Sequence, residues 1–313
     1  MFFRKLKKLR LSFANNTAAN KTHFKLHSIR VNGKHICGFI WQYGHFIHDV
    51  VMPLIDWLEE SQEDPKSMHL LIEDTPDQSI GPFLELLEAL TGVTAEILST
   101  RRFQRAQGIS LELHAYLFGP YKPESFINIQ STIVERFDLT PPENPPGIVL
   151  IERGYSKHGF ESNNRKYIPK YFPGVHPGRR LSNYNKITGA ARRTIVNHAE
   201  LAQALQNKYG KKFHNAVLED MPIAEQVRLF YHARIIIGQH GAGLNNLIWM
   251  HTDKGVVVEI NPCKVKTFSN MCLARGFTHS TVGQFDADKV SINPDDLLST
   301  IEDLLDREST HGN

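Results

Sequence analysis

Short apolar runs alternate with amphipathic stretches along most of this chain. Apolar runs of four to eight residues indicate buried strands, and apolar positions three or four residues apart indicate helices. Apolar strands that alternate with helices form parallel sheets covered on both faces, so the pattern predicts an α/β fold. We expect strands at 35–41, 69–74, 95–100, 147–153, 213–218, 234–238 and 255–260, and helices at 48–60, 82–92, 198–210 (capped by Asn197), 222–233, 243–250, 267–276 and 294–308.

One proline-rich stretch divides the pattern in two. Residues 140–147 read TPPENPPG, a composition that stiffens the chain and excludes regular structure. The sequence therefore predicts two doubly wound, Rossmann-like domains that face a cleft. Their expected limits are 29–145 and 146–313, after a basic segment and polar loop at 1–28. Residues 154–189 are rich in Gly, Asn, Tyr and Arg and are expected to form a long functional loop.

The composition is that of a soluble globular protein, with 41% hydrophobic and 22% charged residues and a net charge of +3. Three cysteines are too few for a disulfide framework, and none forms a CxxC pair, which argues against a cysteine zinc site. They are consistent with a reducing, cytoplasmic compartment. The sequence contains no apolar run of 18 residues, so no spanning helix is expected. Nothing in the composition calls for a nucleic-acid partner.

The first thirteen residues, MFFRKLKKLRLSF, mix aromatic and aliphatic side chains with lysine and arginine. They lack the apolar core and cleavage site of a signal peptide. The pattern suits a short helix on an anionic membrane surface, such as the inner face of a membrane, and it equally suits a solvated basic tail.

The stretch IIIGQHGAGLNNLIWM, 235–250, interrupts an apolar strand with glycines and then resumes with helical spacing. A helix that starts at the carboxyl edge of a parallel sheet presents unpaired N–H groups to a ligand. Gly241 and Gly243, with Ala242 between them, let those amides approach an anion closely, and His240 adds a donor. A phosphate or diphosphate is the expected ligand, although the glycines could also serve only a tight strand-to-helix turn.

Three segments together resemble glycosyltransferase family 61. The C-terminal segment PIAEQVRLFYHARIIIGQHGAGLNNLIWM, followed by GVVVEI, is similar to the family's HGAGL block and the strand after it. YGHFIHDVVMPLIDWLEE resembles the family's N-terminal helix, in the version of the protein O-mannose N-acetylglucosaminyltransferase branch. VLIERGYSKHGF resembles its strand ending in Ser-Arg, although this chain has Glu152-Arg153-Gly154 there.

The resemblance implies a GT-B architecture in which the C-terminal domain holds a nucleotide sugar. It also implies transfer from a UDP-sugar with inversion and with no obligatory metal or other cofactor. The acceptor would be a glycan or lipid-linked glycan, in the synthesis of a surface polysaccharide. Two other functions remain open: a sugar-nucleotide epimerase or hydrolase, and an inactive protein that binds nucleotide sugars.

A transferase without a metal must neutralise its leaving diphosphate with protein groups. Arg153, at the end of a predicted strand, is the first candidate, since a guanidinium grips phosphate oxygens in pairs. Glu259 ends another strand and is expected to accept hydrogen bonds from sugar or ribose hydroxyls, or else to form an ion pair. The remaining donor-site candidates are Arg165, Lys157, His240, Gly241, Ala242, Gly243 and Asn246, with Asn245 or Asn246 supporting the turn.

Inverting transfer also needs a base that takes the proton of the acceptor hydroxyl. Asp49 is the expected base, with His45 one helical turn earlier as its orienting partner and His48 beside it. Asp49 and His45 could instead form a structural pair. The same cluster has zinc-ligand residue types, but no third region offers a partner, so no metal site is predicted.

Overall fold

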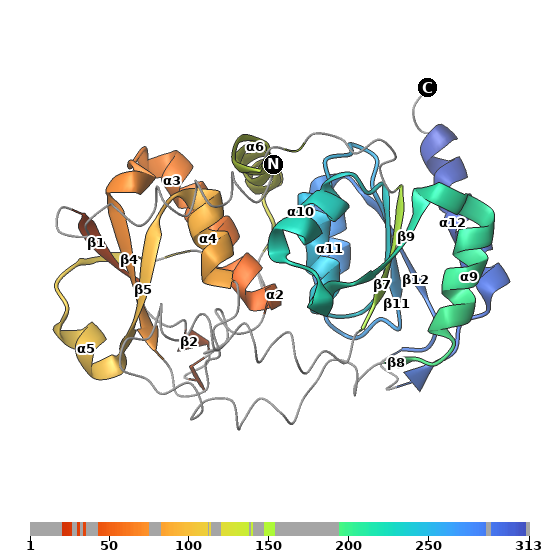
Figure 1. Cartoon of the computed structure of the whole chain (residues 1–313), viewed down its shortest axis with the longest axis horizontal. Coiled ribbons are helices and arrows are strands. Elements are labelled where there is room, and N and C mark those ends of the chain that lie inside the picture. The colour runs from red at the N-terminus through yellow and green to blue at the C-terminus, as the bar shows by residue number, and fades with distance from the viewer. Residues whose placement is uncertain are drawn as a thin grey trace.

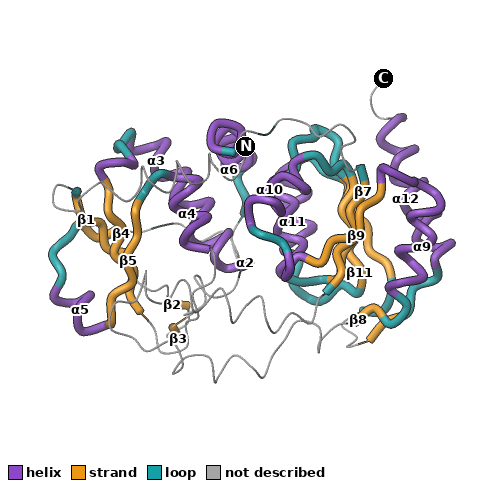
Figure 2. The backbone as a smooth tube through the Cα atoms, in the orientation of Figure 1, coloured by secondary structure: helices purple, strands orange, loops and turns teal. Residues whose placement is uncertain are grey.

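The structure is a computed structural model of the chain. It describes residues 21–26, 30–31, 34–35, 43–74, 83–111, 113, 120–137, 139, 147–153, 194–285 and 289–310. Two α/β lobes lie side by side, each built on its own parallel sheet (Figure 1). Helices cover both sides of the C-terminal sheet (Figure 2). The predicted α/β class is therefore confirmed.

The N-terminal lobe contains a four-stranded sheet in the order β5-β4-β1-β6, with every pair parallel. The order reverses between β1 and β6, as in a doubly wound fold. The predicted strands at 69–74 and 95–100 are confirmed as β4 and β5. The strands are β1 (Thr22–Leu26), β4 (Met68–Asp74), β5 (Thr94–Ser99) and β6 (Ile109–Leu111), and a separate antiparallel pair joins β2 (Arg30–Val31) to β3 (Lys34–His35).

One expectation for this lobe was wrong. Residues 14–28 were predicted to be a loop, but β1 lies within them and occupies an inner position in the sheet. Only Phe24 and Leu26 are buried in this strand, on one face. Two apolar positions in a polar stretch form too short a pattern to predict a strand. Strand β1 is stabilised mainly by its pairing with β4 and β6.

The predicted helix at 48–60 is confirmed and begins earlier. It starts with α2 (Tyr43–Phe46), widens into the π-helical η2 (Ile47–Val51) and continues as α3 (Met52–Ser61). Pro53 has no N–H to donate to the fourth residue before it, and its ring crowds that residue's carbonyl. The wide turn just before Pro53 accommodates this misfit, so the chain continues without breaking.

The N-terminal lobe contains four further helical segments among its described residues. The predicted helix at 82–92 is confirmed as α4 (Phe83–Thr91), which ends before Gly92. The sequence did not predict α5 (Thr100–Arg105), the short η3 (Pro65–Ser67) or the long α6 (Pro123–Arg136). The strand expected at 35–41 and the proline-rich segment 140–146 fall almost entirely outside the described residues.

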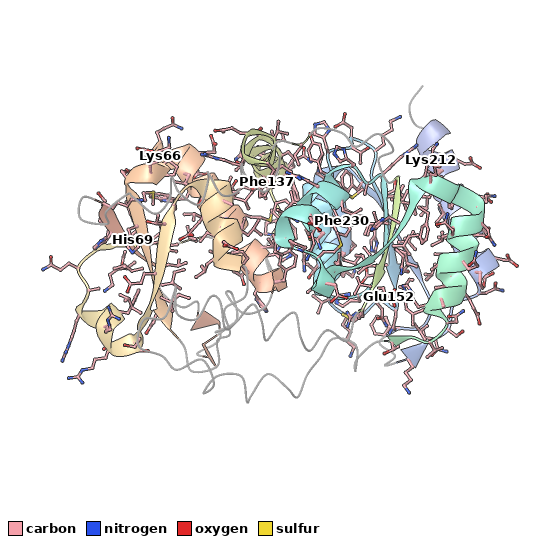
Figure 3. All side chains as sticks on the ribbon, viewed as in Figure 1. Lys66, His69, Phe137, Glu152, Lys212 and Phe230 are labelled. Carbon is pink, nitrogen blue, oxygen red and sulfur yellow. The ribbon has the colours of Figure 1, made fainter. Side chains whose placement is uncertain are left out.

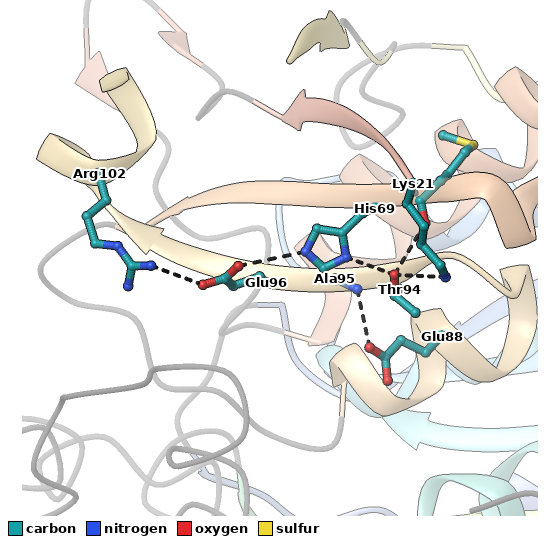
Figure 4. Close-up of polar contacts among 8 residues, drawn as sticks. Lys21, His69, Glu88, Thr94, Ala95, Glu96 and Arg102 are labelled. Carbon is teal, nitrogen blue, oxygen red and sulfur yellow. Dashed lines mark hydrogen bonds and ion pairs between the residues drawn. The ribbon is translucent and has the colours of Figure 1, made fainter. Parts of the chain in front are cut away.

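Polar contacts tie the strands of the N-terminal sheet to one another (Figure 4). His69 on β4 shares a hydrogen bond of 2.8 Å with Thr94 on β5. The Glu96 carboxylate lies 3.8 Å from His69 and 3.5 Å from Arg102 on α5. Because these groups are partly exposed, each ion pair contributes little stability.

The C-terminal lobe contains a five-stranded parallel sheet in the order β12-β11-β10-β7-β9. Helices α10 and α11 cover the face toward the N-terminal lobe, and α9 and α12 cover the other face (Figure 1). All predicted strands and helices of this lobe are present. They are β7 (Ile148–Glu152), α9 (His198–Tyr209), β9 (Phe213–Val217), α10 (Ile223–Tyr231), β10 (Ile235–Gln239), η8 (Ala242–Trp249), β11 (Val256–Ile260), α11 (Thr267–Arg275) and α12 (Pro294–Thr310).

Two details of this lobe differ from expectation. The sequence missed β12 (Thr278–Val282), and also the short pair β8 (Thr194–Ile195) and β13 (Lys289–Val290). Asn197 precedes α9 as predicted, but its side chain makes no capping bond. It donates to the carbonyl of Ile292 (2.8 Å) and accepts from the Ile292 amide (3.1 Å), and so joins α9 to the segment before α12.

The two lobes share an apolar core. Side chains of α3, α4 and α6 belong to the same buried cluster as those of α10, η8 and α11. Helix α6 packs on both lobes, and Gln130 on it donates to the carbonyl of Met250, just after η8. A second cluster lies on the far side of the C-terminal sheet, under α9 and α12. The lobes are therefore held by packing as well as by the connecting chain.

Candidate active site

The strand order of the C-terminal sheet indicates where a ligand would bind. In chain order its strands run 5-4-3-1-2 across the sheet, so the order reverses between β7 and β10. In open parallel sheets, ligands bind outside the carboxyl ends of the strands at this reversal. Two predicted site residues follow these two strands: Arg153 follows β7, beside Glu152 (Figure 3), and His240 follows β10.

The turn after β10 is built around the Arg153 side chain. Its guanidinium donates to the carbonyl of His240 at 2.8 Å. A Cβ placed on Gly241 would fall 2.0 Å from a guanidinium nitrogen of Arg153. Glycine at 241 therefore leaves the room in which the arginine lies against the backbone. The structure brings these two predicted donor-site residues into direct contact.

The predicted helix at 243–250 is a tight 3₁₀-helix, η8, rather than an α-helix. Asn245 donates to the carbonyl of Ala242 (2.9 Å), and Asn246 donates to the carbonyl of Gly243 (3.0 Å). Each side chain thus reaches the carbonyl three residues earlier, which is the spacing of a 3₁₀-helix. The amides at its start still lack partners within the helix, as at any helix N-terminus.

The two glycines of the turn have different surroundings. A Cβ on Gly243 would lie 3.1 Å from Ile151 and 3.2 Å from Leu218, so this glycine lets the turn pack closely on the sheet. Ala242 between them is exposed. The missing Cβ of Gly243 therefore makes room for apolar side chains and not for an anion. The solvent-accessible part of the turn is at Gly241 and Ala242.

His240 is held by an ionic network below the turn. Its Nδ1 hydrogen-bonds to the Glu259 carboxylate, and His279 on β12 reaches the other oxygen of that carboxylate at 2.9 Å. Burial raises the pKa of Glu259, but the hydrogen bonds from His240 and His279 outweigh it, so the pKa lies below its ordinary value. Both oxygens of Glu259 are engaged inside the protein. These two histidine contacts are of the kind that the sequence gave as the alternative to a sugar contact.

The N-terminal helix brings the predicted base residues together. His45 Nδ1 lies 2.8 Å from one Asp49 carboxylate oxygen, as the spacing of four residues predicts. Asp49 is 3% exposed, and its second oxygen is buried with no hydrogen-bond partner among the described residues. A buried carboxylate oxygen without a donor is costly unless a ligand supplies one.

His48 lies in a different environment from its neighbours. It is fully buried, and its Nε2 lies 2.5 Å from the side-chain oxygen of Asn245 in the other lobe. Tyr121, just before α6, donates to its Nδ1 at 3.4 Å. Burial lowers the pKa of His48 to about 4, although the bond to Asn245 opposes this shift. The neutral imidazole therefore links the two lobes.

A second link between the lobes involves Asn246. Its side-chain oxygen accepts hydrogen bonds from Tyr43 (2.7 Å) and from Trp249 (2.9 Å). Asn246 is fully buried, and its amide supports the turn from inside. The sequence singled out no role for Trp249, Tyr121, Cys263 or His279. Each is recognisable only through a partner distant in the sequence.

Several predictions fall outside what the structure describes. Arg165 and Lys157 lie in the segment 154–193, and the basic segment 1–13 is also outside the described residues. Within the described ranges, no group of three or more His, Cys, Asp or Glu side chains is arranged to hold a metal ion. The helices of those ranges include none long and apolar enough to cross a membrane.

Two doubly wound α/β lobes packed against each other form the GT-B architecture, as predicted. The profile of the family described as Glycosyltransferase 61 matches residues 43–257, which include the Asp49 helix, Arg153 and the glycine turn. The chain belongs to glycosyltransferase family 61, and the protein is a glycosyltransferase.

A structure of E. coli heptosyltransferase WaaC with ADP resembles the chain with a TM-score of 0.39 and 10% sequence identity. The match covers 91% of this chain and 98% of that one. No curated protein matches the sequence.

Proposed function

We propose that the enzyme transfers a sugar from a UDP-sugar to a glycan hydroxyl, with inversion of configuration and without a metal ion. The observation that carries this proposal is the contact between Arg153 and the Gly241 turn, at the strand reversal of the C-terminal sheet. A guanidinium beside the amides at the start of a helix suits a diphosphate. A surface-polysaccharide acceptor is part of the same proposal.

In the donor half of the site, Arg153 and the amides of Gly241 and Ala242 hold the diphosphate. As the bond between the anomeric carbon and the diphosphate breaks, negative charge grows on the leaving oxygen. The fixed charge of Arg153 stabilises that oxygen more in the transition state than in the ground state. His240 holds the turn in shape through the Glu259 network below it.

In the acceptor half, the free oxygen of Asp49 takes the proton of the attacking hydroxyl. The acceptor oxygen bonds to the anomeric carbon on the face opposite the leaving diphosphate, which inverts the configuration. His45 holds the other carboxylate oxygen and so fixes the orientation of the base. Asp49 lies in the lobe that meets the turn through Asn245 and Asn246, so both halves belong to one packed unit.

Binding of UDP to the full-length protein tests the donor site. We expect calorimetry to show that Arg153→Ala weakens UDP binding about 30-fold and uridine binding very little, since it removes a charge-assisted contact of about 2 kcal/mol. Arg153→Lys should recover part of the loss, because it keeps the charge without the paired donors. Lys254→Ala removes an exposed charge on the same lobe and serves as the control.

Equal loss of UDP affinity in Arg153→Ala and Lys254→Ala would contradict the donor site. Transfer is then assayed with a panel of UDP-sugars in the presence of EDTA, and the anomeric configuration of the product is read by NMR. Loss of transfer in EDTA, or retention of configuration, would reject that part of the proposal. Free sugar or an epimer as the only product would identify a hydrolase or an epimerase.

A further inference from the structure

Cys263 lies against the glycine turn, although it stands 22 positions after Gly241 in the sequence. The chain leaves β11 through Asn261, whose φ of 55° is left-handed and whose amide donates to Val282 at 2.9 Å. This bend returns the chain toward the end of β10. It places the sulfur of Cys263 2.9 Å from Nε2 of His240.

The direction of the proton in this contact follows from the other side of the ring. Glu259 is an ionised carboxylate with a pKa held low, and it can only accept from Nδ1 of His240. In the neutral form of the ring, Nε2 then carries a lone pair and accepts from the thiol of Cys263. Phe268 packs its ring at 67° to the imidazole with centroids 5.1 Å apart, which helps to fix the ring plane.

A thiol, an imidazole and a carboxylate in this order form a nucleophile with its base and orienting group. His279 holds the carboxylate from the far side, so its position is fixed at both oxygens. Among the described residues, the charged and titratable groups around the imidazole include Glu259, His279, Arg153 from the end of β7, and Cys272 on α11 beside Glu259.

The two free cysteines of the described residues differ in access. Cys263 is partly exposed, whereas Cys272 is fully buried and burial raises its pKa. Thiols react as thiolates, and buried thiols without a base are inert. The protein thus contains one thiol placed to react, Cys263. It also contains one buried thiol, Cys272, which serves as an unreactive control in the same molecule.

We propose that Cys263 is an activated thiol, with His240 as its base, and a site of covalent modification by soft electrophiles. With iodoacetamide, the sulfur bonds to the methylene carbon, the carbon–iodine bond breaks and iodide leaves. The thiol proton passes to Nε2 of His240 and then to water. The imidazolium that forms between these steps is stabilised by the Glu259 carboxylate.

The modification has a consequence that rests on the proposed function. An adduct on Cys263 lies beside His240 and the Gly241 turn, where the diphosphate of the donor is placed. Alkylation therefore excludes the donor, and bound UDP shields the thiol. Reaction of the thiol itself requires no donor, so the two claims are separable.

The experiment measures alkylation of each cysteine in the full-length protein by iodoacetamide at pH 6, using mass spectrometry that resolves the individual peptides. We expect Cys263 to react at least about 10-fold faster than free cysteine, because an ordinary thiol of pKa about 8.5 is almost wholly protonated at that pH. Cys272 should stay unmodified in the folded protein. His240→Gln should slow alkylation of Cys263 about 10-fold.

Glu259→Gln, which keeps the shape and removes the charge, should slow the reaction about 3-fold and guards against misfolding of the His240 variant. Cys272→Ala is the matched control and should leave the Cys263 rate unchanged. Alkylation of Cys263 no faster than free cysteine, or at a rate that neither variant changes, would overturn the inference. Protection by UDP is measured separately: fast alkylation without protection keeps the activated thiol and removes the donor from this turn.

Discussion

Asp49 is unusual among the buried carboxylates of the described residues because one of its oxygens has no partner. Asp56 lies on α3, the continuation of the same helix. Its carboxylate accepts hydrogen bonds from Ser125 (2.6 Å) and Asn128 (3.1 Å). Glu259 is bonded at both oxygens by histidines. A structural carboxylate is expected to look like these two. The free oxygen of Asp49 is therefore the residue-scale reason for placing the base there.

We expect Asp49→Asn to lower kcat by a factor of roughly 100 to 10,000, the range that general-base catalysis contributes. The substitution keeps the size of the side chain and its hydrogen bond to His45 but removes the basic oxygen. UDP affinity should remain at the wild-type value, since the role proposed for Asp49 is toward the acceptor and not the donor. Steady-state transfer and UDP calorimetry on the same protein check both statements.

The matched control is Asp56→Asn, which changes a buried carboxylate on the continuation of the same helix. It should lower the melting temperature through its lost contacts with α6 and leave kcat of the folded enzyme unchanged. Near-wild-type transfer by Asp49→Asn would identify the Asp49–His45 contact as a purely structural pair.

At the scale of the element, the turn after β10 combines two packing requirements. Gly243 lets the start of η8 lie on the β7 side chains, and Gly241 leaves room for the Arg153 guanidinium. The side chains of Asn245 and Asn246 then hold the carbonyls of the first helical residues. The stretch at 243–250, which was expected to form an ordinary helix, therefore forms the 3₁₀-helix η8, and its start lies beside Arg153.

Gly241→Ala is expected to push the Arg153 guanidinium away from the His240 carbonyl and to weaken UDP binding about 10-fold. An added Cβ would overlap the flexible end of Arg153, and the φ of 158° at this position strains a residue with a Cβ, so the melting temperature should also fall. Gly147→Ala at the start of β7 is the control, because its Cβ would meet Lys212 at an ordinary 3.8 Å. Equal UDP affinities for the two alanine variants would show that Gly241 has no part in placing the arginine.

At the scale of the whole molecule, the lobes are joined by polar links set within an apolar core. His48 donates to Asn245, and Asn245 donates to the Ala242 carbonyl, so a chain of hydrogen bonds runs from the helix of Asp49 to the glycine turn. The Tyr43–Asn246–Trp249 contacts run beside it. The acceptor-side helix thereby helps to set the shape of the donor turn.

The buried His48 makes stability depend on pH. Its folded pKa of about 4 lies below the value of 6.5 in an unfolded chain, so between these values only the unfolded state binds the proton. Its contribution is fully present above pH 6.5 and is lost as pH falls toward 4. We expect a loss of about 2 kcal/mol in the free energy of unfolding between pH 7 and pH 5 from this residue.

Urea unfolding of the wild type and of His48→Gln at both pH values isolates the contribution of His48 to the free energy of unfolding. The other histidines are common to the two proteins and cancel in the comparison. Glutamine keeps an N–H donor for Asn245 but does not titrate. The difference in stability between the two proteins should shrink by about 2 kcal/mol at pH 5. A constant difference would mean that His48 is protonated in the folded state or exposed to water.

The sequence by itself determined the α/β class, the two-lobed order of strands and helices, the family, and the contact between His45 and Asp49. The class, the order of elements and the His45–Asp49 contact depend on apolar periodicity and on spacings of a few residues, which local geometry fixes. The family was identified by the resemblance of the HGAGL block and two further segments. It overlooked β1 and β12, because strands with few apolar residues are stabilised mainly by their neighbours in the sheet.

Only the tertiary structure decided how side chains distant in the sequence are used. It turned Glu259 toward two histidines, buried His48 and Asn246 between the lobes, placed Arg153 over Gly241 and brought Cys263 to His240. These contacts depend on which strands are neighbours and on the angle at which the lobes pack. A linear pattern contains neither, because both result from burying the whole apolar surface at once.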